Sequence, residues 1–465
     1  MHIVDYGIVI AYLVVLLFLG LVSRLRRGSS ASDMIVGGRV LTLPAFVASL
    51  VSTWYGGILG VGEYSYNYGL SNWLVFGVPY YLAALLFALF LAKRARESQL
   101  LTIPDQLART YDSKTALAGA VVIYVMTVPA AYVLMLGVLC QYLFGWPMWV
   151  GVSAGTLFSI VYVFSGGFKS VVRTDLFQFV LMFTGFTVLL VALNIGYGGI
   201  DFVMDRVPET HLTWHGGNSG WYVAVWYVIA LATLIEPAFY QRCYAARTSS
   251  VARRGIFISI ICWTVFDFLT TSCGLYARAI LPDLADPVAA YPALALHVLP
   301  AGLMGLFALA LLSTVMSTVD SYSFLAASTF GNDIAPRIAR IPESMIIPLT
   351  RFGLVISTLL AVALALFFRS VVDIWHALGS IGTPALLVPV FFSFVGKWRL
   401  PGHAAFISIV TSALISGIWY FSRYFSSEGN YWFDIEPIFP GLLWSIILFV
   451  LLHVTYGRRF HPRTG

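Results

Sequence analysis

Long apolar segments recur along the whole sequence and leave little of it for anything else. Taking about 20 apolar residues per membrane span, we predict helices over residues 3–23, 42–64, 71–95, 114–143, 147–165, 172–198, 219–245, 252–281, 298–330, 346–368, 371–395, 402–422 and 437–456. Backbone groups in a bilayer have no water to bond, so each segment must satisfy its own hydrogen bonds as a helix. We therefore expect an all-α polytopic membrane protein with about 13 transmembrane helices.

Composition excludes several classes of protein. The chain is 59% hydrophobic and 10% charged, which is too apolar for an ordinary soluble protein. Its net charge of +6 does not indicate nucleic-acid binding, because the Lys and Arg residues lie in short loops without interleaved aromatics. The eight histidines are scattered, so no enzyme is predicted. The expected partners are the lipid bilayer and a small molecule, with no obligatory protein partner evident and no appended soluble domain.

Basic residues predict the orientation of the chain. With the N-terminus outside and the C-terminus in the cytoplasm, four basic residues face out: Arg206, Arg278, Arg369 and Arg423. The other 23 of the 27 Lys and Arg residues are then cytoplasmic, as the positive-inside rule requires. We expect an integral protein of the cell (inner or plasma) membrane.

The first apolar segment is expected to stay as a helix. Asp5 precedes it and Arg24, Arg26 and Arg27 follow it, which is the reverse of a signal peptide. Its start should therefore face outward.

The four cysteines fall in or at the ends of apolar segments: Cys140, Cys243, Cys262 and Cys273. They form neither a CxxC pattern nor a Cys/His metal pattern. We predict free thiols.

A polar stripe crosses the apolar segment from Ala310 to Ile334. Thr314, Ser317, Thr318 and Ser321 recur at i, i+3, i+4 and i+7, so they share one helix face. Asp320 lies beside the stripe, and an ionisable group inside a span is costly enough to indicate function. Hydroxyl and carboxylate oxygens suit a hard cation, so we interpret the stripe as half of a sodium site. The alternatives are hydroxyls that bond back to their own helix, or small residues that let helices pack closely.

Two of the predicted helices are interrupted. The second contains STWYGGILGVG, rich in glycine, and the seventh contains Glu236-Pro237. Interrupted backbone at membrane depth is tolerated where it lines a cavity or is buried in protein. The two breaks are five spans apart, which is the pattern of an inverted five-plus-five repeat.

Asp175 follows a Gly-Gly turn near the start of the sixth helix. A carboxylate there is stabilised by the helix dipole whatever else it does. It is therefore a cap, a partner for Lys169 or Arg173, or part of a site.

Several motifs together carry a family resemblance. They are Thr102–Tyr111, Gly166-Gly167 with Thr174-Asp175 and Gln178, Pro237 with Gln241-Arg242 and Ala245-Ala246, Gly274–Leu284, and Ser317-Thr318 with Asp320-Ser321, Ser328 and Asn332-Asp333-Ile334. Over roughly residues 35–400 the chain resembles the sodium:solute symporter family, which contains the sodium/glucose, sodium/proline and sodium/sialic acid cotransporters.

The resemblance implies the leucine-transporter fold, in which ten core helices form two inverted repeats. On that basis we expect an extra N-terminal helix and basic loop over residues 1–30, a symporter core over 35–400, and accessory helices with a basic tail over 401–465.

The resemblance also implies where sodium binds. The ligands carried over by position are the backbone carbonyls of Ser52, Tyr55 and Thr314 and the side chains of Ser317 and Thr318. This set agrees with the polar stripe.

Some members of the family bind a second sodium nearer the cytoplasm. The matching residues here are Asp175, Ser317, Asp320 and Ser321. Two carboxylates in one place would repel unless a cation or a proton lies between them, so we expect a second cation site or an exit relay. The chain departs from the proline transporters at Trp54, where they carry an aspartate.

The solute is expected beside the two breaks. The candidate binding residues are Trp54, Gly56 and Gly57 on the second segment and Trp226 and Thr233 on the seventh. We find no Lys or Arg inside a span that would hold a dianion, which favours a neutral, zwitterionic or monoanionic solute. The roles of Glu63, Glu236 and Asp267 stay open; Glu63 and Asp267 contact a proton, a cation or a substrate amine, or are paired structural groups.

The function that the resemblance implies is secondary active transport, with inward sodium movement coupled to uptake of a small polar organic solute by alternating access. Two alternatives use the same scaffold. One is a proton-coupled carrier in which Asp320 or Asp175 titrates, and the other is a solute sensor that does not transport.

Overall fold

The computed structural model describes residues 1–25, 28–339, 341–368, 371–395, 400–426 and 429–456. Within these ranges the chain is helical apart from its connections and one isolated bridge between Leu41 and Ala246. The α-helices are α1 (Ile3–Leu21), α2 (Ala31–Ile35), α3 (Leu43–Trp54), α4 (Ile58–Tyr68), α5 (Val78–Phe90), α6 (Ala92–Glu97), α7 (Ile103–Thr110), α8 (Ser113–Thr127), α9 (Ala130–Phe144), α10 (Met148–Gly166), α11 (Phe168–Tyr197), α12 (Ile200–Met204), α13 (Gly220–Ile229), α14 (Pro237–Ala245), α15 (Ser249–Ile280), α16 (Ala290–Val298), α17 (Leu303–Ser328), α18 (Ala335–Ala339), α19 (Ile346–Phe368), α20 (Val371–Val395), α21 (Gly402–Phe421) and α22 (Ile438–Tyr456).

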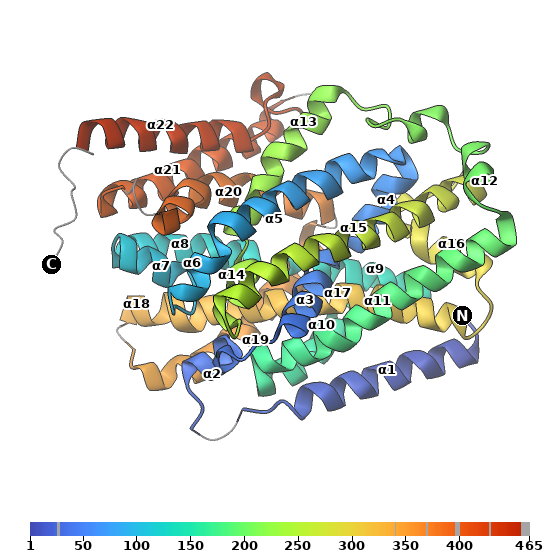
Figure 1. Ribbon diagram of the computed structural model, residues 1–465, viewed down its shortest axis with the longest axis horizontal. Coiled ribbons are helices and arrows are strands. Elements are labelled where there is room, and N and C mark those ends of the chain that lie inside the picture. The colour runs from blue at the N-terminus through green and yellow to red at the C-terminus, as the bar shows by residue number, and fades with distance from the viewer. Residues whose placement is uncertain (26–27, 340, 369–370, 396–399, 427–428, 457–465) are drawn as a thin grey trace.

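The long helices form one bundle with roughly aligned axes (Figure 1). In the described ranges, 12 helices are long and apolar enough to cross a membrane. The thirteenth expected segment forms α22, a helix of 19 residues. The span that contains α17 is the most enclosed, with 89% of its apolar window buried, whereas 28% is buried in α1. The helix with the polar stripe therefore lies at the centre of the bundle.

Both predicted interruptions are present. A short 3₁₀ turn, η2 (Tyr55–Gly57), separates α3 from α4, and a second, η5 (Ala230–Ile235), separates α13 from α14. A third break, between α8 and α9 at Val128 and Pro129, was not predicted, although proline is a sufficient cause because it cannot donate to the preceding turn.

The two broken helices are joined at one end. The N–H of Leu41, just before α3, donates to the carbonyl of Ala245 at the end of α14 (3.0 Å). The N–H of Arg247 donates back to the carbonyl of Leu41 (2.9 Å). These two hydrogen bonds link the start of the first broken helix to the end of the second.

The N-terminal helix is attached to the core by Asp5. Its Oδ1 accepts the N–H groups of Gly302 (2.7 Å) and Gly305 (2.9 Å) at the start of α17. These donors are among those a helix leaves unpaired at its N-terminus, so Asp5 caps a second helix. At the other end of the chain, α21 and α22 pack on α20.

Ser30 directly precedes α2 and forms a capping box with Asp33 at the start of that helix. Its N–H donates to Asp33 Oδ2 (3.0 Å), and the Asp33 N–H donates to Ser30 Oγ (3.1 Å). The hydrogen bonds from Ser30 hold the pKa of Asp33 below its ordinary value, and Lys169, 3.8 Å away, acts in the same direction. Lys169 is therefore occupied by a surface partner.

α1 begins and α22 ends at opposite ends of the bundle (Figure 1). The four cysteines are free thiols. The basic residues Arg26, Arg27 and Arg369 and the tail from residue 457 lie outside the described residues.

Candidate functional site

The polar stripe is buried and faces the first broken helix. Thr314, Ser317, Thr318 and Ser321 are at most 1% exposed, and α17 packs against α3, η2 and α11. A row of hydroxyls at this depth must find partners, because an unpaired polar group in an apolar interior is costly. Their partners decide between a site and simple packing.

Thr318 contacts the end of α3 directly. Its Oγ1 donates to the carbonyl of Thr53 at 2.7 Å and lies 3.3 Å from the carbonyl of Thr314. A Cβ placed on Gly56 would lie 2.3 Å from Thr318 Oγ1, so only glycine permits this approach. The close contact between the break and α17 therefore depends on Gly56 on one side and Thr318 on the other.

Replacing Gly56 by Ala should force α17 away from η2. We expect a loss of about 1–3 kcal/mol in the free energy of unfolding, typical of overpacking, together with weakened sodium binding. Thermal unfolding with and without sodium measures both. Gly417→Ala on α21 is the matched control, because nothing lies within 4 Å of its added Cβ. Equal behaviour of the two variants would contradict this account of Gly56.

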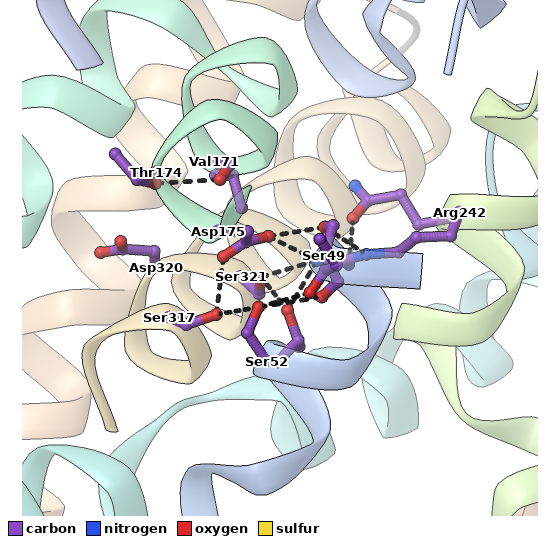
Figure 2. Close-up of polar contacts among 12 residues, drawn as sticks. Ser49, Ser52, Val171, Thr174, Asp175, Arg242, Ser317, Asp320 and Ser321 are labelled. Atoms are coloured by element: carbon purple, nitrogen blue, oxygen red, sulfur yellow. Dashed lines mark hydrogen bonds and ion pairs between the residues drawn. The ribbon is translucent and has the colours of Figure 1, made fainter. Parts of the chain in front are cut away.

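Ser317 joins three helices. Its Oγ lies 2.6 Å from Asp175 Oδ1 on α11 and 3.0 Å from Ser52 Oγ on α3 (Figure 2). The Ser52 hydroxyl already donates to the carbonyl of Ala48 (2.8 Å). With Asp175 ionised, the single proton of Ser317 can serve only one of two oxygens, so one close oxygen–oxygen contact lacks a proton.

This donor set fits a sodium ion. The hydroxyls of Ser317 and Thr318 face α3, and the Thr314 carbonyl lies 3.3 Å from Thr318 Oγ1. The contact with Ser52 is to its hydroxyl, whereas the expected ligand there is its carbonyl. Tyr55 directly follows α3 at the break, where helix-end carbonyls are left without intrahelical partners. Oxygen ligands with a deficit of protons are suited to a small hard cation.

Asp175 is bonded from three sides. It is 0% exposed and accepts from Ser49 Oγ (2.6 Å) as well as from Ser317. Arg242 of α14 lies 3.5 Å away from its second oxygen. Neither of the sequence-predicted partners pairs with it: Lys169 is paired with Asp33, and Arg173 donates to Ser23 Oγ (3.1 Å).

Arg242 is the functional residue that the sequence reasoning missed. We assigned it to a basic cytoplasmic loop and found no arginine placed inside a span; this was wrong, because α14 continues to Ala245 and Arg242 is 0% exposed within it. Its guanidinium donates to Ser321 Oγ (2.7 Å), Thr53 Oγ1 (2.9 Å) and Ser49 Oγ (3.2 Å). The signal in the sequence was a buried aspartate that needed a counter-charge.

Asp320 bonds to a different helix from those that Asp175 contacts. Its Oδ2 accepts from Tyr162 of α10 (2.5 Å), and Figure 2 shows its carboxylate turned away from the network around Ser317. The reason is helical geometry: Asp320 and Ser321 are neighbours in sequence and therefore about 100° apart around the helix. The expected grouping of Asp175, Asp320 and Ser321 around one cation is therefore not what the structure shows.

The predicted solute residues fall into separate groups. Trp54 packs against Tyr80, Phe239 and Trp263, whereas Trp226 packs against Phe76 and Tyr222. Gly56 touches Thr318, Gly57 is partly exposed, and Thr233 is buried with its hydroxyl unpaired in the described chain. Their role in solute binding stays a prediction.

A buried acid on α15 binds the side chain of Tyr55 at the break between α3 and α4. Asp267 of α15 accepts hydrogen bonds from the hydroxyls of Tyr55 and Tyr81. The side chain of Tyr55 is thereby fixed to α15 while its backbone forms the break. Of the roles left open for Asp267, the paired structural one has direct support.

A small pocket lies beside the second broken helix. It is lined by Pro237, Tyr240, Gln241 and Tyr244 of α14, Leu325, Ser328 and Thr329 of the stripe helix and its extension, and residues of the loop Leu101–Pro104. The pocket therefore lies between the second broken helix and α17.

Comparison with known proteins gives one consistent family. The model described as "SSF: Sodium:solute symporter family" matches residues 34–411. The sodium/pantothenate symporter of Escherichia coli is 24% identical over 97% of this chain and 95% of its own length. The sodium/proline symporter 2 of Staphylococcus saprophyticus is 23% identical over 95% of this chain and 91% of its own length.

Solved structures agree with the fold. A Na⁺-coupled sialic acid symporter in a substrate-bound outward-open state superposes with a TM-score of 0.82 over 99% of both chains, at 16% identity. Mhp1, a nucleobase-cation-symport-1 family transporter in a closed conformation, superposes with a TM-score of 0.56 over 93% of this chain and 96% of its own, at 11% identity. The chain therefore has the leucine-transporter-like fold.

Proposed function

This chain belongs to the sodium:solute symporter family and is a sodium-coupled solute transporter of the plasma membrane, and we propose that its sodium ion binds between the end of α3 and the polar stripe of α17. The proposed ligands are the carbonyls of Ser52, Tyr55 and Thr314 and the hydroxyls of Ser317 and Thr318. The solute is a small polar organic molecule. The N-terminus faces outward and the C-terminus the cytoplasm, as the distribution of basic residues supports.

One observation carries the sodium site. Ser317 has a single proton and two oxygens at hydrogen-bond distance, Asp175 Oδ1 and Ser52 Oγ. A sodium ion that takes the Ser317 hydroxyl oxygen as a ligand, next to these two oxygens, would offset the repulsion between them, whereas packing alone would leave it. The site also lies where α3 is interrupted, so ion binding draws together the broken helix and the central helix.

The proposed site couples ion and solute by linkage. If sodium favours the state that binds solute, each ligand raises the affinity of the other by the same factor. Entry of one sodium ion releases about 2.3 kcal/mol per 100 mV of inside-negative potential. Since about 1.4 kcal/mol corresponds to a factor of ten, one ion supports a solute gradient of more than tenfold. Rocking of one helix bundle against the other would then open the binding sites to each side of the membrane in turn.

The guanidinium of Arg242 takes the place proposed for a second cation. It contacts Asp175 and Ser321, two of the residues expected to bind that ion, and it carries the charge the ion would supply. We therefore expect one sodium ion to move with each solute. Reversal potentials measured at several sodium gradients give this ratio directly, and a ratio of two would contradict the assignment of Arg242.

Sodium-dependent stability tests the proposed function. The purified chain should unfold at a higher temperature, and change its tryptophan fluorescence, as sodium replaces potassium at constant ionic strength, because an ion that binds only the folded state stabilises it. Absence of any response to sodium, with a response to acidification instead, would favour a proton-coupled carrier.

A further inference from the structure

Glu236 is an intramembrane acid to which the sodium site gives no role. It lies between η5 and α14, with φ −65° and ψ 113°, inside the span Gly220–Ala245. Unlike Asp175 and Arg242, which are fully buried, it is partly exposed. A carboxylate at such a depth requires a partner, and its exposure shows that part of it faces open space.

The contacts of Glu236 leave half of its carboxylate open. Tyr322 OH donates to Oε1 at 2.9 Å, and the N–H of Ala238 donates to the same atom at 3.3 Å. Within the described ranges both hydrogen bonds fall on Oε1, so Oε2 is available. The ring of Tyr322 lies 5.1 Å from that of Tyr132 on α9, inclined by 55°, and Tyr132 is also partly exposed. Tyr322 thus contacts the carboxylate through its hydroxyl, and Tyr132, from a different helix, packs against the ring of Tyr322.

The charge of Glu236 has no contact ion pair in the described chain. Arg242 lies on the same helix but directs its guanidinium to Asp175, Ser49 and Ser321. Its charge is largely offset by Asp175. Glu236 therefore has no cationic partner at contact distance within the described residues.

Glu236 also lies beside both the pocket and the sodium site. The next residue, Pro237, lines the pocket together with Leu325 of α17. Tyr322 follows Thr318 by four residues, so both side chains lie on one face of α17. A group bound at Glu236 would be one helical turn from the proposed sodium ligands.

We propose that Glu236, with Tyr132 and Tyr322, binds the ammonium group of a zwitterionic or cationic amine, and that such an amine is the transported solute. A carboxylate with an open oxygen close to tyrosine side chains can recognise an ammonium group, since aromatic rings attract cations as well. An anionic group at the same place would be repelled by Glu236. The inference rests on the proposed function and names its class of substrate.

The test uses thermal unfolding of the purified full chain in sodium and in potassium, at constant ionic strength. The probes are proline and choline as ammonium compounds, glucose as a polyol and lactate as a carboxylate. We expect a sodium-dependent rise in unfolding temperature with an ammonium probe and none with glucose or lactate. Glu236→Gln should weaken binding of the effective probe roughly 10- to 100-fold, because a charged hydrogen bond is lost, and should keep the response to sodium.

Glu97→Gln is the control. Glu97 also carries a carboxylate, but it lies on α6, where it pairs with Lys93 at 3.8 Å and is 52% exposed. This variant should keep the affinity for the probe.

Three results would overturn the inference. They are stabilisation by glucose or lactate without stabilisation by an amine, stabilisation by none of the four probes in a chain that responds to sodium, and unchanged probe affinity in Glu236→Gln. If that variant does not fold, Tyr132→Leu replaces it: removal of the ring should weaken choline or proline binding at least threefold, and no change would contradict the proposal. Failure of the intact chain to respond to sodium would instead contradict the proposed function.

Discussion

Asp175→Asn should lower the free energy of unfolding by about 3–5 kcal/mol, the cost of leaving a buried charge without its partner. The guanidinium of Arg242 is 0% exposed, and Asp175, at 3.5 Å, is its ion-pair partner in the described residues. Arg242→Gln should cost a similar amount because it leaves the carboxylate unpaired. Combining both changes should recover part of the loss, since the remaining side chains are neutral.

Lys169→Gln is the control that separates the effect of burial from the effect of breaking an ion pair. The Lys169–Asp33 pair is also a basic–acidic contact, at 3.8 Å, but its side chains are 44% and 38% exposed. Solvent-exposed pairs contribute about 0–1 kcal/mol. Thermal unfolding in detergent ranks the variants, and an Asp175→Asn protein as stable as Lys169→Gln would show that the buried pair does not hold the site together.

Ser317→Ala and Thr318→Ala should each weaken sodium binding at least tenfold, equivalent to about 1.4 kcal/mol. Each removes one oxygen ligand and one contact between α17 and α3. Titration of tryptophan fluorescence with sodium measures the affinity.

Ser328→Ala provides the control on the same helix. Ser328 is buried, and its hydroxyl donates to the carbonyl of Phe324 on its own helix (2.7 Å). Its sodium affinity should match that of the unaltered chain. A Ser317→Ala protein with the same affinity as Ser328→Ala would remove α17 from the sodium site.

Local patterns in the sequence were sufficient for several parts of the fold. Hydrophobic length located the spans, glycines and Glu236-Pro237 located both breaks, and the 3.6-residue period placed Thr314, Ser317 and Thr318 on one face. Each of these depends on residues close together in the chain, where helix geometry decides the outcome. The resemblance to a family supplied what the pattern could not, namely which other helix faces the stripe.

Arg242 shows why the rest of the site could not be predicted from sequence. The sequence around Arg242 is typical of a basic loop. The positive-inside rule counts basic residues on each side of the membrane and does not distinguish an exposed one from a buried one. Its burial depends on Ser49, Asp175 and Ser321, which come from three other helices. Only the folded chain brings these partners together.

Asp320 and Trp226 are different cases. The direction of Asp320 follows from its register on α17, so the helical period alone could have separated it from Ser321. Trp54 and Trp226 were predicted to line one space because each lies beside a break. Trp54 packs against Phe239 of α14, whereas Trp226 lies on α13, at the opposite end of η5. Residues on either side of a break need not face the same space.

Binding of radioactive sodium to the purified chain at equilibrium tests the central claim most directly. We predict saturable binding that corresponds to one ion per chain, lost in Ser317→Ala and preserved in Ser328→Ala. Two ions per chain would contradict the role given to Arg242. Absence of saturable binding, or binding that Ser317→Ala leaves unchanged, would contradict the sodium site between α3 and α17.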